Sequence, residues 1–449
     1  MHLCTRSSFL NAAIVAAALL ATVPAHALPA FARQTGQNCI ACHVSFPELT
    51  PYGRYFKLSG YTLGERQTLP FAMMAEVGYT KTRDNQVDDG SGTGTTTPLS
   101  EDDGKVKFSD AGLFLAGKAN DNIGAFVQWT YDGIEHHSSI DNTDIRIVGR
   151  YEAPGSKEPD LIYGLTLHNN PTVQDVWNST PAFSFPFTGS PVANEPSTPG
   201  ALVDGTLAQQ TTGIGGYLYW KKMLYGELTL YRDSTGPFSW MRAPDLADST
   251  RLKGYNPYWR IAYNHEWDAN SIEVGAFGMT GKVYLDPTDT GSPTNKYTDW
   301  AIDGQYQYIT DPQVFTAQAT YIHEKQSLDA SFNAGNSTNA SDTLKTFRAK
   351  GTYYYQRKYG ATLAYAQTTG SADPLLYASG TPGTGFAANG LPDSTSWTLE
   401  LDYLPIQNVR LMAQYIWYTK FNGASTNYDG FGRDASANNT LFLNMWVAF

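Results

Sequence analysis

Apolar and polar residues alternate with a period of two along most of this chain of 449 residues, and this pattern limits its fold more than any other feature. In residues 71–80, Phe, Met, Ala, Val and Tyr occupy every second position. In residues 397–403, Trp, Leu, Leu and Tyr alternate with Thr, Glu and Asp. A strand with this pattern turns one face to each of two environments, and about ten residues cross a bilayer when the strand is tilted. We therefore expect an all-β protein whose strands turn their apolar side to lipid.

Sixteen such segments follow one another from residue 71 to the end of the chain. Bacterial single-chain barrels have even numbers of strands, so the count predicts a 16-stranded antiparallel outer-membrane β-barrel. A soluble β-rich protein of the periplasm is the alternative that this pattern leaves open. The expected strands are 71–82, 105–119, 123–132, 140–151, 160–170, 206–220, 224–233, 256–267, 272–284, 296–309, 314–325, 343–355, 359–368, 394–404, 409–418 and 438–449.

The connections between these segments alternate between long and short after the first strand. Short periplasmic turns and longer extracellular loops are typical of outer-membrane barrels, so 83–104 and 171–205 are expected outside the cell. The same asymmetry puts the N-terminal segment and Phe449 on the periplasmic side. Aromatic residues near strand ends or on the outer face are expected to form the interfacial girdles. These residues are Tyr79, Trp129, Tyr217, Trp220, Trp259, Trp267, Trp417 and Trp446.

Residues 1–27 have the three parts of a secretory signal peptide. Arg6 gives a positive start, 9–23 are mostly apolar, and Ala25-His26-Ala27 is a cleavage site of the A-x-A type. Beyond this leader there is no run of about 18 apolar residues, so no membrane-spanning helix is expected. The formal net charge of -11 argues against a nucleic-acid partner. The sequence thus predicts an exported protein located in the outer membrane.

The pentad Cys39-Ile40-Ala41-Cys42-His43 is a C-x-x-C-H motif, which in an exported protein is typical of covalent c-type haem attachment. Cys39 and Cys42 would form the two thioether bonds, and His43 would be the proximal iron ligand. Three other interpretations are weaker. A disulfide this short would stabilise little, a thioredoxin-like pair would need a βαβ pattern, and zinc would need a second pair of ligands. We therefore expect one covalent haem c.

The chain divides near residue 68 into a haem module, 28–68, and a barrel, 69–449. About forty residues bury little core unaided, and the linker to the first strand is short, so the module is expected in or at the barrel lumen. Residues 28–68 contain no Met and no second His, so a distal ligand must come from the barrel or be absent, which leaves an open or water-bound site. The inward-facing candidates on our facing assignment are His168, Met412 and Met74.

Between residues 27 and 61 the chain reads ALPAFARQTGQNCIACHVSFPELTPYGRYFKLSGY. This stretch resembles the N-terminal signature of the fused monohaem cytochrome–porins, the outer-membrane iron oxidases of iron-oxidising bacteria and their relatives. The barrel portion is similar to that family in architecture and length only. The resemblance implies a small cytochrome fused to a sixteen-stranded porin. The matching residues are Pro29, Phe31, Ala32, Arg33, Gln34, Thr35, Gly36, Cys39, Cys42, His43, Pro47, Leu49, Gly53, Arg54, Phe56, Lys57, Gly60 and Tyr61.

The resemblance further implies a function, iron(II) oxidation at the cell surface with electrons passed inward. The expected partners are an extracellular reductant such as Fe(II), a periplasmic electron carrier (a cytochrome c or a copper protein) and outer-membrane lipid. As an enzyme, the chain would be an iron(II):cytochrome c oxidoreductase. The alternative is a porin whose haem module acts as a plug, gate or redox sensor.

Charged residues on the predicted inner wall are expected to line the lumen as solvated groups, with an ion path as the functional alternative. These residues are Glu76, Asp144, Arg146, Glu273, Asp299, Asp303, Arg348, Lys350, Glu400, Asp402 and Arg410. The first long loop is acidic and could concentrate Fe(II) electrostatically. Its carboxylates are Asp84, Asp88, Asp89, Glu101, Asp102 and Asp103.

Overall fold

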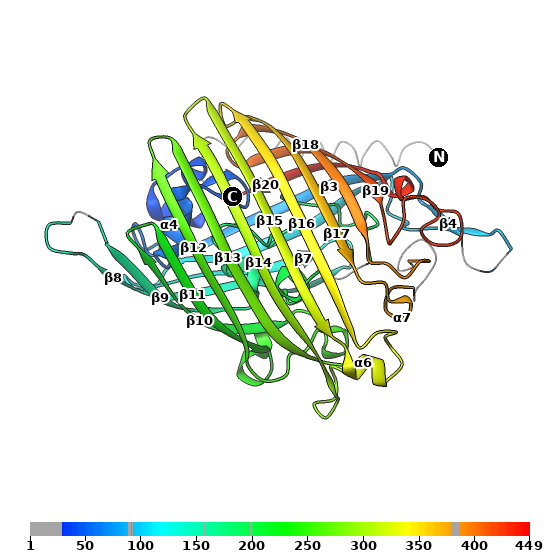
Figure 1. Cartoon of the computed structure of the whole chain (residues 1–449). Helices are drawn as coiled ribbons and strands as arrows, with labels where there is room; N and C mark the ends of the chain where they lie inside the picture. The colour runs from blue at the N-terminus through cyan, green and yellow to red at the C-terminus, as the bar shows by residue number, and fades with distance from the viewer. Residues whose placement is uncertain (1–28, 89–90, 92, 157, 198–199, 379–386) are drawn as a thin grey trace.

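The structure is a computed structural model that describes residues 29–88, 91, 93–156, 158–197, 200–378 and 387–449. The predicted signal peptide, 1–27, lies outside the described residues. Sixteen antiparallel strands close into one barrel, in which β3 pairs with both β6 and β20 (Figure 1). The prediction of a 16-stranded all-β barrel is therefore confirmed.

The barrel strands agree closely with the predicted segments, and the largest shift is at β10, which begins at Thr211 rather than at residue 206. The strands are β3 (Phe71–Thr82), β6 (Val106–Lys118), β7 (Ile123–Asp132), β8 (His137–Tyr151), β9 (Leu161–His168), β10 (Thr211–Trp220), β11 (Leu224–Asp233), β12 (Asn256–Trp267), β13 (Asn270–Tyr284), β14 (Thr294–Ile309), β15 (Gln313–Ser327), β16 (Ser341–Tyr355), β17 (Tyr359–Gly370), β18 (Ser394–Ile406), β19 (Val409–Lys420) and β20 (Thr440–Ala448).

The two faces of each strand differ as the alternation predicts. On β12, Arg260 and Tyr258 point inward and are buried, whereas Ile261 on the other face is 62% exposed. Leu228 and Leu165 are likewise exposed on the outer face of their strands. A closed barrel satisfies its backbone hydrogen bonds without an edge, and an apolar outer face requires lipid. The chain is thus an outer-membrane β-barrel. Within the described residues, no helix is both long and apolar enough to span a membrane.

Two of the predicted girdle aromatics face the lumen instead. The Tyr217 hydroxyl donates a hydrogen bond to the carbonyl of Leu58 at 2.7 Å, and the Tyr217 ring is buried. Trp446 packs edge-to-face on Phe46, with ring centroids 4.3 Å apart. Both side chains contact the N-terminal module, which explains their inward orientation in a lumen that contains apolar groups.

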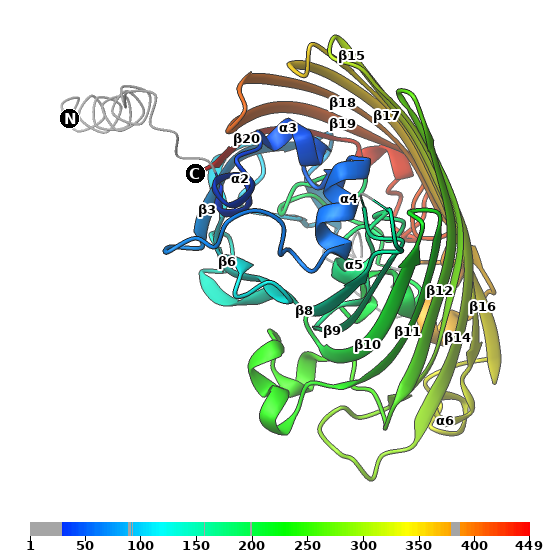
Figure 2. The same cartoon turned by 90° about the vertical axis from the view of Figure 1, so that its left-hand side faces the viewer.

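The N-terminal module lies inside the ring of strands (Figure 2). It consists of α2 (Ala30–Thr35), α3 (Cys39–Cys42), the strand pair β1 (His43–Ser45) and β2 (Glu48–Leu49), and α4 (Pro51–Leu58). Pro51 stands in the first turn of α4, and the Thr50 hydroxyl caps the helix by accepting from the amide of Gly53 at 3.1 Å. The module contacts the short turns: Arg357 of the β16–β17 turn donates to the carbonyl of Ile40. It therefore occupies the short-turn end of the lumen, which is the periplasmic end in barrels of this class.

The connection between β9 and β10 folds into the lumen rather than outside the cell, which corrects the prediction for 171–205. We call residues 169–210 the lumen loop; it contains α5 (Pro171–Gln174) and the helical turn η1 (Leu202–Thr206). Trp177 of this loop is 2% exposed, and its ring lies 5.2 Å from that of Tyr225 on the barrel wall. The lumen therefore holds two bodies, the module and this loop.

The remaining elements lie at the long-loop end, where Figure 1 shows β4, α6 and α7 opposite the end that carries α4. They are β4 (Gln86–Asp88), β5 (Thr96–Pro98), η2 (Gly236–Met241), η3 (Leu246–Asp248), α6 (Asp329–Asn333), α7 (Pro374–Tyr377) and η4 (Ala435–Asn438).

Candidate haem site

The N-terminal end of helix α4 holds the C-x-x-C-H turn in place. The amide of Thr50 donates to the carbonyl of Cys42 at 2.9 Å, and the Thr50 hydroxyl donates to the carbonyl of Ala41 at 2.5 Å. Gly53 lets the two helices touch, because a Cβ added there would lie 2.2 Å from the Cys42 carbonyl oxygen. The resemblance to cytochrome–porins includes this glycine, and the contact gives its physical reason: no larger residue fits between α3 and α4.

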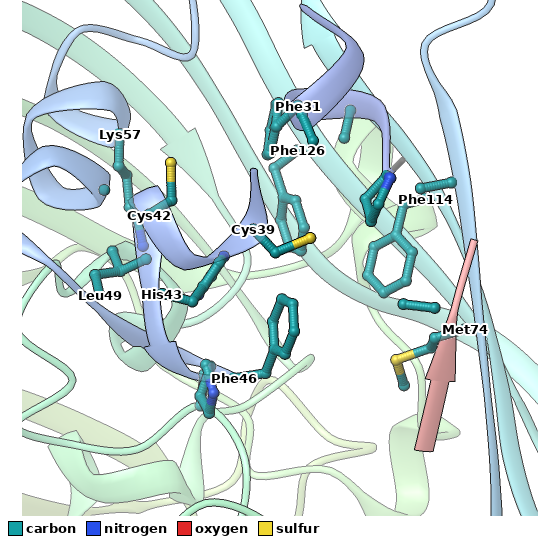
Figure 3. A pocket seen from close by; sticks show the side chains of 18 of the residues that line it. Phe31, Cys39, Cys42, His43, Phe46, Leu49, Lys57, Met74, Phe114 and Phe126 are labelled. Carbon is teal, nitrogen blue, oxygen red and sulfur yellow. The ribbon is translucent and has the colours of Figure 1, made fainter. Parts of the chain in front are cut away.

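Cys39, Cys42 and His43 line a cavity of about 280 Å³. Aromatic and aliphatic side chains from the module and from the barrel wall form most of its surface, as Figure 3 shows. Phe31 and Phe46 come from the module, Phe114 from β6 and Phe126 from β7. An apolar cavity with a few converging polar groups is the ordinary form of a cofactor site.

Burial favours the neutral form of all three candidate side chains. Burial lowers the pKa of His43 to about 4, although the backbone carbonyls of Pro47 and Glu48 oppose the shift. Burial, with Cys39 nearby, raises the pKa of Cys42 to about 11, and burial also raises the pKa of Cys39. Redox-active cysteine pairs have lowered thiol pKa values, so this environment argues against the thioredoxin-like interpretation. Neutral imidazole is the form that coordinates a metal.

These residues fit a covalently held haem. Both thiols are free and border an apolar cavity. His43 borders the same cavity, and the backbone carbonyls of Pro47 and Glu48 lie beside its imidazole. A proximal histidine and a lining of apolar side chains are what a haem requires from its protein. Cys39, Cys42 and His43 would hold the group.

The structure separates the three distal-ligand candidates. Met74 lies in the cavity wall. His168 is buried elsewhere in the lumen: its Nε2 pairs with the Tyr231 hydroxyl at 2.6 Å and its Nδ1 with the Thr166 hydroxyl at 3.1 Å. Met412 on β19 is buried and faces inward, but it is not part of the cavity lining. All three point into the lumen, and Met74 borders the cavity.

Polar side chains fix the module to the barrel wall. Arg54 donates to the amide oxygens of Gln305 and Gln307 at 2.9 and 2.8 Å. The Tyr61 hydroxyl donates to Asp144 at 2.6 Å. Glu48 pairs with Lys350 at 3.1 Å. Of these residues, the sequence indicated Arg54 and Tyr61 through the resemblance and Asp144 and Lys350 through their inward parity. It did not indicate Glu48, Gln305 or Gln307, and the pairing itself needed the three-dimensional register.

Several of the inner-wall charges are buried in ion pairs, whereas the sequence predicted a solvated lining. Arg260 lies 3.1 Å from Glu273 and 2.6 Å from Asp303, and all three are buried. Arg410 on β19 pairs in the same way with two buried carboxylates of β18, Glu400 and Asp402. Buried charges need such partners because an isolated one is costly to desolvate. Among the described residues, no group of three His, Cys, Asp or Glu side chains is arranged to hold a metal ion.

The acidic first loop is partly neutralised. Asp103 pairs with Lys81 at 2.7 Å, and Asp102 pairs with Lys107 at 2.9 Å. Asp89 lies outside the described residues. Electrostatic concentration of a cation by this loop stays a prediction.

Comparisons with known proteins concern the barrel. No family model and no curated protein matches the chain. Similar solved structures include a loop-deletion mutant of OmpT of Vibrio cholerae, with 11% identity over 84% of this chain and 98% of that chain, and a TM-score of 0.46. The channel DcaP of Acinetobacter baumannii has 13% identity, coverages of 84% and 96%, and a TM-score of 0.44. An anion-selective porin of Comamonas acidovorans has 10% identity, coverages of 84% and 98%, and a TM-score of 0.46. The strand pairing described above, not these distant similarities, establishes the fold.

Proposed function

We propose that this chain is an outer-membrane c-type cytochrome barrel that moves electrons between an extracellular donor and a periplasmic carrier. One observation carries the proposal: the two thiols and the imidazole of the C-x-x-C-H motif border an apolar cavity inside a membrane barrel. A bound haem would supply one-electron transfer between ferric and ferrous iron. Fe(II) is the leading donor, from the family resemblance, and a cytochrome c or a copper protein is the expected acceptor.

The protein's own residues would bind and bury the group. Cys39 and Cys42 would tether it, and His43, kept neutral by burial, would occupy one axial position. Phe31, Phe46 and the barrel phenylalanines would exclude water, which is one of the factors that set a haem potential. The module lies at the short-turn end, where a periplasmic carrier could approach.

A channel is the second candidate, and the barrel class alone supports it better than electron transfer. Sixteen-stranded barrels commonly enclose an aqueous lumen. In that function the module would be a plug, gate or redox sensor. Its wall contacts through Arg54, Tyr61 and Glu48 favour a fixed plug over a mobile gate.

Two measurements on the purified full-length protein test the proposal. Intact-mass analysis should find one haem adduct on the mature chain, and the Cys39→Ala/Cys42→Ala variant should lack it. Stopped-flow mixing with Fe(II) should reduce the haem of the wild type. A wild-type chain without the adduct contradicts the proposal outright. A haem that neither Fe(II) nor other external reductants reduce, together with ion or sugar flux in liposomes, would assign the chain to the channels.

The outer-membrane location gives a simple control. Both functions require the product in the outer-membrane fraction, where the strand pairing places it. The double cysteine variant should appear there in similar amount if the barrel folds without the adduct, which separates haem loss from misfolding.

A further inference from the structure

Met74 is a methionine on the first barrel strand with its side chain turned into the haem cavity. It is 5% exposed, whereas Met73 beside it is 44% exposed on the outer face. Figure 3 shows Met74 across the cavity from His43, with the Cys39 side chain and the Phe46 ring between them. Gly112 of β6 pairs with Met74 and gives it room, since a Cβ there would lie 3.1 Å from the methionine Cγ.

Trp446 holds the sulfur atom of Met74. Its indole N–H donates to the Met74 Sδ at 3.2 Å from the neighbouring strand β20. The Trp446 ring packs on Phe46 at 4.3 Å, and the Phe46 ring lies 4.5 Å from the His43 ring. A line of contacts therefore joins the barrel methionine to the module histidine through two aromatic rings. A donor on the sulfur orients the thioether, as second-shell groups orient other metal ligands.

The two rival ligands are less suited to the task. Both ring nitrogens of His168 already have partners in Tyr231 and Thr166, so ligation through Nε2 would cost the buried Tyr231 hydroxyl its bond to the histidine. Met412 is as deeply buried as Met74, at 5% exposure, but lies outside the cavity lining. Met412 is therefore a matched control for Met74: the same residue type, the same burial and the same lumen.

We propose that Met74 is the distal axial ligand of the haem and that Trp446 is the positioning residue for its sulfur. The inference rests on the proposed haem attachment and adds the ligand set, His43 on one side and a thioether on the other. Thioether sulfur suits iron in a haem, and Met ligation raises the reduction potential relative to other axial choices. A higher potential of the haem makes its reduction by an external donor more favourable.

The first test uses the wild-type holoprotein and needs no variant. Its oxidised haem should give the electron paramagnetic resonance and magnetic circular dichroism signature of low-spin His/Met ligation. A bis-histidine or a high-spin signature would overturn the assignment of Met74. A wild-type chain with no haem at all would instead contradict the proposed function, so the two failures are distinguishable.

The second test compares Met74→Leu with Met412→Leu. Leucine conserves the volume of methionine, so both variants should fold, and the heat-modifiable migration of the barrel on gels checks that they do. Met74→Leu should lose the His/Met signature and show a lower reduction potential in spectroelectrochemical titration, whereas Met412→Leu should match the wild type. A Met74→Leu spectrum and potential equal to those of the wild type would overturn the proposal.

The positioning role has its own readout. Trp446→Phe keeps a ring against Phe46 but removes the N–H donor. The variant should keep the low-spin His/Met signature and show a shift of potential smaller than that of Met74→Leu. An unchanged potential would remove Trp446 from the proposal and leave Met74 in it.

Discussion

The two bodies inside the barrel differ in how they meet the wall. The lumen loop is held by charge: Asp204 pairs with Arg348 at 2.6 Å, and the amides of Leu202 and Val203 donate to Glu324 and Asp299 at 2.7 and 2.8 Å. The module is held by polar contacts at its rim, but the face that carries Cys39 and His43 borders an apolar cavity. The module therefore presents its two thiols and its imidazole to an apolar cavity.

This difference separates residues that only pack the barrel lumen from residues that could bind a ligand. Asp204 of the loop has an ion-pair partner on the wall, so packing accounts for this buried charge. In the module, two free thiols and the His43 imidazole border an apolar cavity. Groups of that kind indicate a ligand. The following variants test whether the module and the lumen loop can be perturbed independently of each other.

Lys350→Met should have the largest effect, because Lys350 touches both bodies. Its ammonium lies 3.1 Å from Glu48 of the module, 3.4 Å from the Pro186 carbonyl and 4.0 Å from the Phe187 ring of the loop. Its loss leaves the buried Glu48 carboxylate without its ion-pair partner, so the free energy of unfolding should fall by about 3–5 kcal/mol. Urea unfolding in lipid vesicles measures this value.

The double variant Lys350→Met/Glu48→Gln should recover most of that loss, since no buried charge then lacks its partner. Lys345→Met changes an exposed lysine on the same strand and should be neutral. Equal unfolding curves for Lys350→Met and Lys345→Met would show that the two bodies do not depend on this contact.

Gly53→Ala should damage the module alone. The added methyl would meet the Cys42 carbonyl at 2.2 Å and push α4 away from the C-x-x-C-H turn. Overpacking of this kind costs about 1–3 kcal/mol, and the yield of haem per chain should fall with it, as read from absorbance against protein concentration. Gly351→Ala is the control, because a Cβ at Gly351 would meet nothing within 4 Å. Full haem occupancy in Gly53→Ala would refute the close packing.

Asp204→Asn should loosen the lumen loop and leave the module untouched. The variant weakens a charge-assisted hydrogen bond to Arg348, which is itself partly exposed, so the expected loss is about 1–2 kcal/mol. Ion conductance in planar bilayers should rise, while haem content stays the same. The exposed Asp248, changed to Asn, serves as control. A fall in haem content would mean that the two bodies are coupled.

Asp102→Asn should have the smallest effect. Asp102 pairs with Lys107 and Lys105 in the first long loop, where Lys107 lowers the pKa of the carboxyl and water screens the pairs. The unfolding midpoint should not change measurably. A slower haem reduction by Fe(II) than in the wild type at low salt, with no difference between the two proteins at high salt, would instead support cation concentration by this loop.

The barrel could be predicted from the sequence because each strand places an apolar residue toward lipid at every second position. That signal is local, and it placed β11 and β12 at their observed ends. The inward course of the lumen loop could not be predicted, since residues 171–205 carry no period and their position depends on distant partners such as Arg348. Tyr217 was misassigned for a related reason: its partner, the Leu58 carbonyl, belongs to another segment.

The candidate site divides in the same way. Cys39, Cys42 and His43 form a contiguous motif that the sequence shows directly. Met74, Met412 and His168 have the same inward parity, and parity cannot say which of them lies beside the module. That choice depends on which strands share the cavity with α3, here β3 and β20, and no local pattern encodes this arrangement.

Trp446 and Met74 stand on the last and first strands of the barrel, so part of the cavity wall does not exist until the sheet closes on itself. Once β3 has paired with β20, the barrel wall surrounds the module that carries Cys39. We therefore expect a group as large as a haem to be joined to the two thiols before the seam between these two strands closes.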